Sequence, residues 1–240
     1  MRIEDIEYRD GGVRLVGQLA IDDSRQGRRP GVLVCHEGPG LTDHTKSIAR
    51  RLAALGYVAF AMDYHGDGKP LANIADTMPR LAPWRVDPTG IRVRATAALD
   101  VLKAQWATDP NRLAAIGYCF GGTTALELAR AGTDLKAVVG FHSGLATARP
   151  QDAINIRAKI LVNIGADDPI IPPGQRLDFE KEMRAAKVDW RLNLYGGAGH
   201  SFTNPAIDAR GMAGFAYHEP TDRRSWRAML DLFDETMGPV

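Results

Sequence analysis

The feature that most constrains the fold is a repeated alternation of short apolar runs with segments of helical periodicity. The apolar runs are continuous, as expected for strands that are buried on both faces. Strands that alternate with helices predict an α/β fold with a mainly parallel central sheet flanked by helices. The series begins with a strand at Gly31–Cys35 and a helix at Thr45–Leu55, where Gly56 supplies a signal for the end of the helix.

The remaining elements follow the same rhythm over residues 1–240, which we expect to form a single domain. Further strands are expected at Tyr57–Met62, Leu113–Tyr118, Ala137–Phe141, Ile160–Ile164 and Trp190–Leu194. Further helices are expected at Thr89–Trp106, Thr123–Ala131, Gly174–Ala186 and near Asp222–Thr236. An N-terminal hairpin is expected from Ile3–Tyr8 and Val13–Ile21, and the proline-containing stretch Asp63–Pro88 predicts a long loop or a small lid.

Composition narrows the class of protein. Hydrophobic residues make up 45% of the chain and charged residues 25%, which is typical of a soluble globular domain. The net charge of +1 gives no electrostatic reason to expect nucleic acid or an anionic membrane as a partner. Two cysteines do not form a disulfide framework, and the charged start Met1–Asp5 lacks the apolar core of a signal peptide. We therefore expect a cytoplasmic protein.

The sharpest chemical signal is Gly117–Gly122, a G-x-C-x-G motif between a predicted strand and a predicted helix. Hydrolases carry a nucleophile on such a turn, where side chains at the flanking positions would collide with the strand and helix. The helix N-terminus favours a thiolate at Cys119, and the backbone N–H of Phe120 is then placed to bind an oxyanion. Alternatively, Cys119 is a small buried hydrophobe in a glycine-rich turn.

A base and an acid follow Cys119 in the chain. His200 lies in a glycine loop directly after a predicted strand, and Asp168 lies in the loop after another. Ligands bind beyond the carboxyl ends of the strands in such sheets, so these residues are expected to meet Cys119. The order nucleophile, acid, histidine is that of the α/β-hydrolases. Asp167 competes for the acid role, but Asp168 fits the usual Gly165-x-x-Asp168 frame, and Asp167 is then expected to cap the turn.

Other candidate residues have weaker claims. We expect His44 at a helix start, His218 before the last helix, and His142 near the pocket without a reactive role. Asp63–Asp67 contains possible metal ligands, but no second cluster completes a site. No metal and no cofactor are therefore expected.

The segment Cys35–Gly40 supplies the remaining part of the predicted site. It follows the strand after which α/β-hydrolases provide a second oxyanion donor, and the N–H of Gly38 is the candidate. Glu37 would repel a nearby thiolate or accept its proton, although it could equally be a surface residue of a glycine turn. Cys35 is expected to pack in the strand.

Together, the motif around Cys119, the glutamate at Glu37, Asp168 and the Gly199–Phe202 loop resemble the dienelactone hydrolase (carboxymethylenebutenolidase) family of α/β-hydrolases. The resemblance implies the α/β-hydrolase fold, with Cys119, Asp168 and His200 as a catalytic triad. It also implies that Glu37 holds the resting thiol until substrate binding releases a thiolate toward the histidine.

One position departs from the family pattern. Dienelactone hydrolases bind the substrate carboxylate partly through an arginine four residues after the catalytic histidine, and here that position is Asn204. An amide cannot form the bidentate charged pair. Arg80 or Arg85 could compensate in part, but the departure argues against a dienelactone as the natural substrate.

The predicted function is hydrolysis of a small-molecule ester or lactone through a thioester on Cys119. Alternatives on the same scaffold are a general carboxylesterase or thioesterase. A non-catalytic α/β-hydrolase that binds a ligand is a further alternative, although no triad residue is missing. A thiol redox role lacks the C-x-x-C pattern that would support it.

Overall fold

The protein is described by a computed structural model that covers residues 1–240. All of its strands lie in one eight-stranded sheet of order β1-β2-β4-β3-β5-β6-β7-β8. The strands are β1 (Arg2–Asp10), β2 (Val13–Ile21), β3 (Arg29–Cys35), β4 (Val58–Ala61), β5 (Thr108–Tyr118), β6 (Ala137–Phe141), β7 (Lys159–Gly165) and β8 (Trp190–Tyr195). The β1–β2 hairpin joins β4 antiparallel, and the strands from β4 to β8 are parallel. The expected α/β architecture with an N-terminal hairpin is confirmed.

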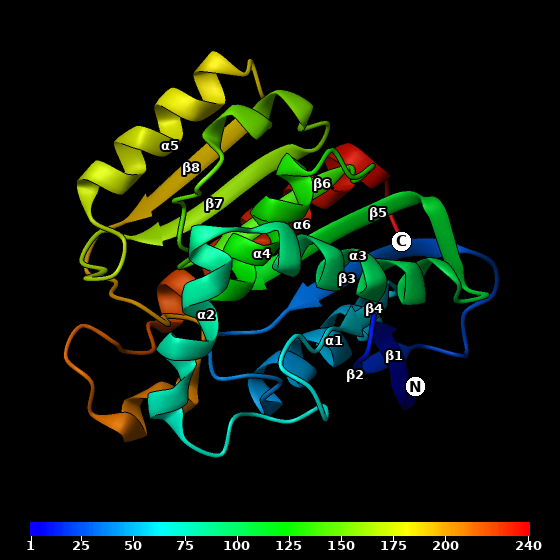
Figure 1. Cartoon of the computed structure of the whole chain (residues 1–240). Coiled ribbons are helices and arrows are strands. Elements are labelled where there is room, and N and C mark those ends of the chain that lie inside the picture. Colours follow the sequence, from blue (N-terminus) through cyan, green and yellow to red (C-terminus); the bar gives the residue numbers. More distant parts are fainter.

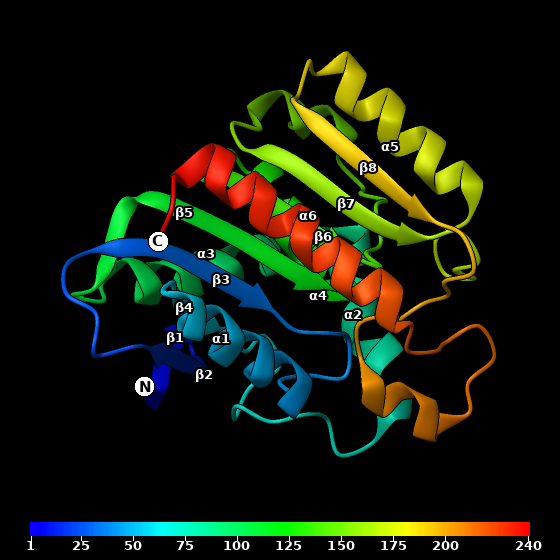
Figure 2. The same ribbon diagram turned by 180° about the vertical axis from the view of Figure 1, so that it is seen from behind.

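Helices cover both faces of the sheet. They are α1 (Asp43–Leu55), α2 (Thr77–Val86), α3 (Thr89–Lys103), α4 (Phe120–Arg130), α5 (Pro173–Ala185) and α6 (Glu219–Met237). Figure 1 shows α3, α4 and α5 in front of the sheet, and Figure 2 shows α1 and α6 on the opposite face. Each face has its own apolar core, of 35 and 25 buried residues respectively. No helix combines the length and the apolarity needed to cross a membrane.

Two boundaries differ from expectation in ways that matter for the site. The Asp63–Pro88 stretch was expected to be a loop or lid, but it contains the 3₁₀ turn Ile74–Asp76 and helix α2. Pro83 is tolerated inside α2 because its missing N–H leaves only one carbonyl of a short helix unpaired. Helix α4 begins at Phe120, earlier than the expected Thr123, because Cys119 itself is the N-cap residue.

Candidate active site

Cys119 occupies a sharp turn between β5 and α4. Its φ of 54° and ψ of −119° are unusual for a residue with a side chain. The glycines around it are required by close backbone approach. A Cβ on Gly117 would lie 2.0 Å from the Gly121 carbonyl oxygen, and a Cβ on Gly121 would lie 2.2 Å from that of Cys35. The turn thus fixes Cys119 at the N-terminus of α4, beside the end of β3.

Asp168 and His200, two of the predicted site residues, are in hydrogen-bond contact. His200 Nδ1 lies 2.8 Å from Asp168 Oδ2, and both side chains are buried. The other oxygen of Asp168 accepts hydrogen bonds from the backbone N–H groups of Ile170 (2.8 Å) and Ile171 (3.2 Å). The carboxylate is therefore oriented by its own loop and in turn orients the imidazole. Asp167, its competitor in the sequence, is exposed to solvent.

The surroundings of His200 favour its charged form. Burial disfavours the imidazolium, but Cys119 and Asp168 outweigh it and raise the pKa of His200 to about 10. Because Nδ1 is held by Asp168, Nε2 is the nitrogen available to Cys119, and Nε2 is buried with no other partner. The rings of His142 and Phe215 pack against the imidazole, with centroids 5.1 Å and 4.8 Å away.

Glu37 is buried next to this group rather than on the surface. Asn204 Nδ2 lies 3.3 Å and 3.5 Å from its two carboxylate oxygens, and His44 Nδ1 lies 3.5 Å from Oε1. Burial alone would raise the pKa of the Glu37 carboxyl, but His44 and Asn204 hold it below its usual range. Glu37 is therefore an anion with partners of its own.

The loop that carries Gly38 is held through its carbonyl groups. The Tyr64 hydroxyl lies 3.0 Å and 2.9 Å from the carbonyl oxygens of His36 and Glu37, and His65 Nε2 lies 2.7 Å from that of Gly38. The N–H of Gly38 makes no hydrogen bond within the protein. Phe120 is the first residue of α4, and its N–H has no acceptor within the helix. Both N–H groups are therefore free to bind an anion.

The Asn204 side chain contacts Glu37. At the position where the family pattern has a substrate-binding arginine, this side chain is buried against Glu37, and its Oδ1 accepts a hydrogen bond from Ala206 N–H. This contact with Glu37 could not be predicted from the sequence, because the two residues are 167 positions apart in the chain.

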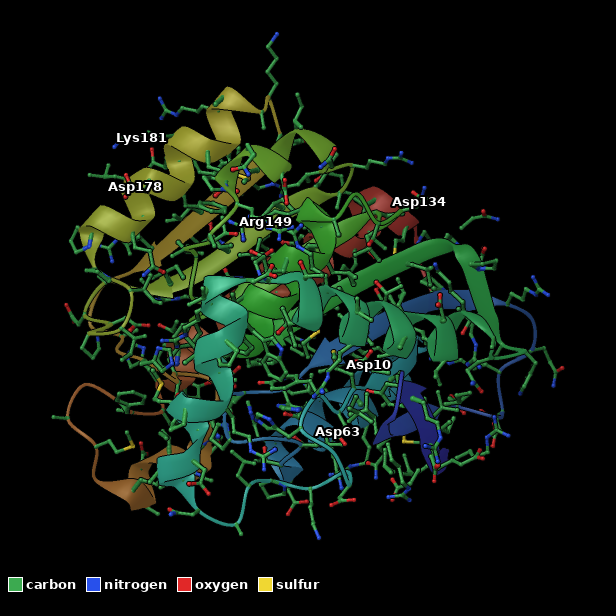
Figure 3. All side chains as sticks on the ribbon, in the orientation of Figure 1. Asp10, Asp63, Asp134, Arg149, Asp178 and Lys181 are labelled. Carbon is green, nitrogen blue, oxygen red and sulfur yellow. The ribbon has the colours of Figure 1, made fainter.

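Several residues around the site act as supports. The His142 ring is fully buried with Nε2 2.9 Å from Thr203 Oγ1, and burial lowers its pKa well below the usual range. Asp63, labelled in Figure 3, accepts hydrogen bonds from four backbone N–H groups on β2 and its own turn. Asp63 therefore orders the loop that presents Tyr64 and His65. Cys35 is fully buried in the core, as expected.

A cavity of about 270 Å³ lies beside Phe120 and the Asp168 loop. Its apolar lining includes Trp84, Pro88, Ile91, Phe120, Ile170 and Ile171. Its polar lining includes Arg85, Thr123, Glu127, Thr147 and Gln175. Glu127 is paired with Arg92 at 2.7 Å, whereas Arg85 has no ion-pair partner. Residues of α2 and of the loop after β6 both contribute to this lining, whereas no residue of 204–220 does.

An exposed ion pair links two segments that line this cavity. Arg149, labelled in Figure 3 on the loop near α2 and α4, lies 2.8 Å from Asp87 Oδ1. In the chain, Arg149 comes directly after the lining residue Ala148 in the loop after β6. Asp87 comes directly after α2, which contributes Trp84 and Arg85 to the lining. The pair therefore joins two segments that contribute to the lining of the cavity.

The family model for dienelactone hydrolases matches residues 16–237. The chain belongs to the dienelactone hydrolase family. It is therefore a hydrolase of the dienelactone hydrolase type, and its sheet and helices form an α/β-hydrolase fold.

Individual dienelactone hydrolase relatives agree with this assignment. A Yersinia pestis protein with the provisional name carboxymethylenebutenolidase is 31% identical over 93% of this chain and 85% of its own length. The solved structure of m3DLH is 49% identical, with a TM-score of 0.95 over 98% of each chain. The dienelactone hydrolase-like promiscuous phosphotriesterase P91, from metagenomic libraries, is 43% identical, with a TM-score of 0.94 over 99% of each chain.

Proposed function

We propose that the protein, acting as a single domain over residues 1–240, hydrolyses small-molecule esters or lactones with Cys119 as nucleophile. The observation that carries the proposal is the position of Cys119. It occupies a strained N-cap turn and is a principal cause of the raised pKa of His200, which is itself held by Asp168. A thiol, a base and an orienting carboxylate are the groups that covalent acyl transfer requires.

The reaction begins with a thiolate on Cys119 and an imidazolium on His200. The sulfur attacks the substrate carbonyl carbon, a C–S bond forms, and the carbonyl π electrons move to oxygen. The N–H groups of Gly38 and Phe120 stabilise this oxyanion, a contribution of roughly 3–4 kcal/mol for one such donor in a related site. The tetrahedral intermediate collapses, the C–O bond breaks, and the leaving alkoxide takes the proton from His200 Nε2.

Water completes the cycle. Neutral His200 removes a proton from water, and the hydroxide attacks the thioester carbonyl. The C–S bond breaks, so that the carboxylic acid is released and Cys119 leaves as the thiolate that began the cycle. Asp168 keeps its charge and stabilises the imidazolium at each stage. Because sulfur is a better leaving group than an amide nitrogen, esters and lactones are better substrates than peptides.

The cavity gives the substrate its size and character. Apolar and aromatic walls suit a compact hydrophobic acyl or ring group, and the unpaired Arg85 suits a polar or anionic substituent at one side. Arg85 is the one cationic residue of this lining, so a substrate with a single anionic group fits the cavity best.

Hydrolysis of a small panel tests the proposal. The panel holds p-nitrophenyl acetate, a five-membered and a six-membered lactone, an acyl thioester, an anilide and a phosphotriester. The wild type is expected to turn over esters or lactones with little action on the anilide, and Cys119→Ala is expected to lose turnover. Cys35→Ala is the matched control, because it removes the other thiol. Full activity of Cys119→Ala on the same substrates would contradict the proposal, and preference for the thioester would favour a thioesterase.

A further inference from the structure

His44 contacts Glu37 near Cys119 and His200, but the proposed reaction does not use it. It is in the first turn of α1, and 8% of its side chain is exposed. Its Nε2 lies 3.1 Å from the Thr203 carbonyl oxygen. Its Nδ1 is buried without a hydrogen bond and lies 3.5 Å from Glu37 Oε1, an ion-pair distance. Both ring nitrogens therefore face acceptors. A neutral imidazole has one N–H and can serve only one of them, so this environment favours the doubly protonated ring.

Glu37 has the complementary requirement. A buried carboxylate is costly unless it is paired, and the neighbours that meet it are His44 and the Asn204 amide. Burial lowers the pKa of His44, but Glu37 outweighs this effect and raises it above the usual range. Glu37 and His44 thus stabilise one another as a buried ion pair.

This pair is connected to the reactive histidine by two routes. His200 is among the charges that lower the pKa of Glu37, so the two groups interact electrostatically. Thr203, whose carbonyl oxygen faces His44, also has its hydroxyl 2.9 Å from His142 Nε2, and His142 packs against His200. A change at His44 can therefore reach the reactive group.

We propose that His44 is a positioning residue whose positive charge holds Glu37 as an anion against Asn204, so that the resting Cys119 thiolate is paired with His200 alone. The inference rests on the proposed function, because it assumes that Cys119 is the reacting thiol. In this proposal the resting partner of Glu37 is His44, whereas the family resemblance implies the Cys119 thiol.

The charges around His44 allow this role. The titratable groups that face it are Glu37 and Asp222, which favour its protonation, His142, whose pKa it helps to lower, and Tyr118, whose ring edge packs 5.2 Å away. Burial raises the pKa of Tyr118 well above its usual range, so Tyr118 remains neutral. Without the charge on His44, Glu37 would keep only an amide partner. It would then repel the thiolate or accept the thiol proton.

Three variants separate charge from structure. His44→Gln removes the charge, His44→Lys keeps a cation, and Lys46→Gln removes a cation from the same turn of α1 that does not contact Glu37. The readouts are kcat/KM for p-nitrophenyl acetate and the rate of Cys119 alkylation by iodoacetamide between about pH 5.5 and 9. At neutral pH, His44→Gln is expected to slow both by about tenfold, the effect of one unit in proton affinity. His44→Lys is expected to restore most of the loss, and Lys46→Gln is expected to match wild type.

Repeating the His44 substitution in a Glu37→Gln variant makes the test specific for the Glu37–His44 pair. In Glu37→Gln, the further change His44→Gln is expected to have no effect on alkylation, because the carboxylate that it controls is absent. An equal effect in both backgrounds, or no rescue by lysine, would overturn the inference. If Cys119→Ala keeps activity, the proposed function fails; if it is inactive while His44→Gln is normal in both readouts, only the role of His44 fails.

Nitrogen-15 chemical shifts of the histidine rings in wild type test the inference without any substitution. At pH 6.5, where an ordinary histidine is half protonated, His44 is expected to be mainly doubly protonated. A mainly neutral His44 ring at this pH would overturn the role.

Discussion

His200 and Asp168 are joined through the Nδ1 side of the imidazole, at 2.8 Å, which leaves Nε2 facing Cys119. The two backbone N–H groups that bind the other oxygen of Asp168 prevent the carboxylate from rotating. The tautomer and the direction of the ring are thereby set before any substrate binds. In the proposed reaction, this arrangement makes Nε2 the atom that gives and takes the proton.

Replacing Asp168 tests this orientation. Asp168→Asn keeps the size of the side chain, but its amide can donate to Nδ1 and stabilise the wrong tautomer. We expect ester hydrolysis to fall by roughly 10²- to 10⁴-fold in kcat, as in a comparable triad. The measurement is steady-state kinetics on the preferred ester. Asp167→Asn is the matched control, since this neighbour is exposed, and we expect it to retain wild-type kinetics. The opposite pattern would assign the acid role to Asp167.

The glycine at position 121 sets how closely the Cys119 turn approaches β3. A Cβ there would lie 2.2 Å and 2.4 Å from the backbone oxygens of Cys35 and His36, and backbone cannot rotate away as a side chain can. We expect Gly121→Ala to lower the free energy of unfolding by about 1–3 kcal/mol. The displacement should also reduce activity, because it moves the two N–H groups that would bind the oxyanion.

Gly174 provides the comparison for this change. A Cβ at Gly174, in the first turn of α5, would meet nothing within 4 Å. We expect Gly174→Ala to be neutral or to stabilise the fold by up to about 1 kcal/mol, because alanine restricts the unfolded chain more than glycine does. Urea unfolding measures both variants. Equal effects at the two positions would show that the turn tolerates a side chain at residue 121.

Buried neutral histidines predict a loss of stability in mild acid. Burial lowers the pKa of His36 to about 3 and that of His142 well below its usual range. Below about pH 6.5 the unfolded chain therefore binds protons that the native state does not, and stability falls as pH falls. His44 and His200 have raised pKa values, so their contribution is present at low pH and is lost as pH rises instead.

His142→Asn isolates one of these histidines, and asparagine tolerates the positive φ of 41° at this position. Between pH 6.5 and 5.5, we expect the free energy of unfolding of the variant to fall by about 1 kcal/mol less than that of wild type. The comparison uses the change with pH, so a lower starting stability of the variant does not affect it. An identical pH slope in the two proteins would mean that His142 accepts a proton in the native state.

The order of strands and helices, the hairpin and the positions of Cys119, Asp168 and His200 beyond the strand ends could be read from the sequence, because local apolar patterns and glycine turns specify them. Helix α2 was missed because its two prolines mask a short helix that is stabilised by contacts of Leu81 and Trp84 rather than by its own pattern. The partners of Glu37 were also missed. His44 reaches it from α1 and Asn204 from the loop after β8, and no local pattern predicts a contact made only in the folded chain.

The central claim is that Cys119 carries the acyl group during turnover. Its most direct test is intact-protein and peptide mass spectrometry after acid quench of the enzyme with p-nitrophenyl acetate, using wild type and His200→Asn. Without the base that activates water, His200→Asn should release p-nitrophenol slowly and retain the acetyl group. The account predicts an added acetyl mass on the peptide that contains Cys119, and none in Cys119→Ala. Turnover in which no acyl group is ever found on Cys119, or an acyl group on another residue that supports hydrolysis, would contradict the account.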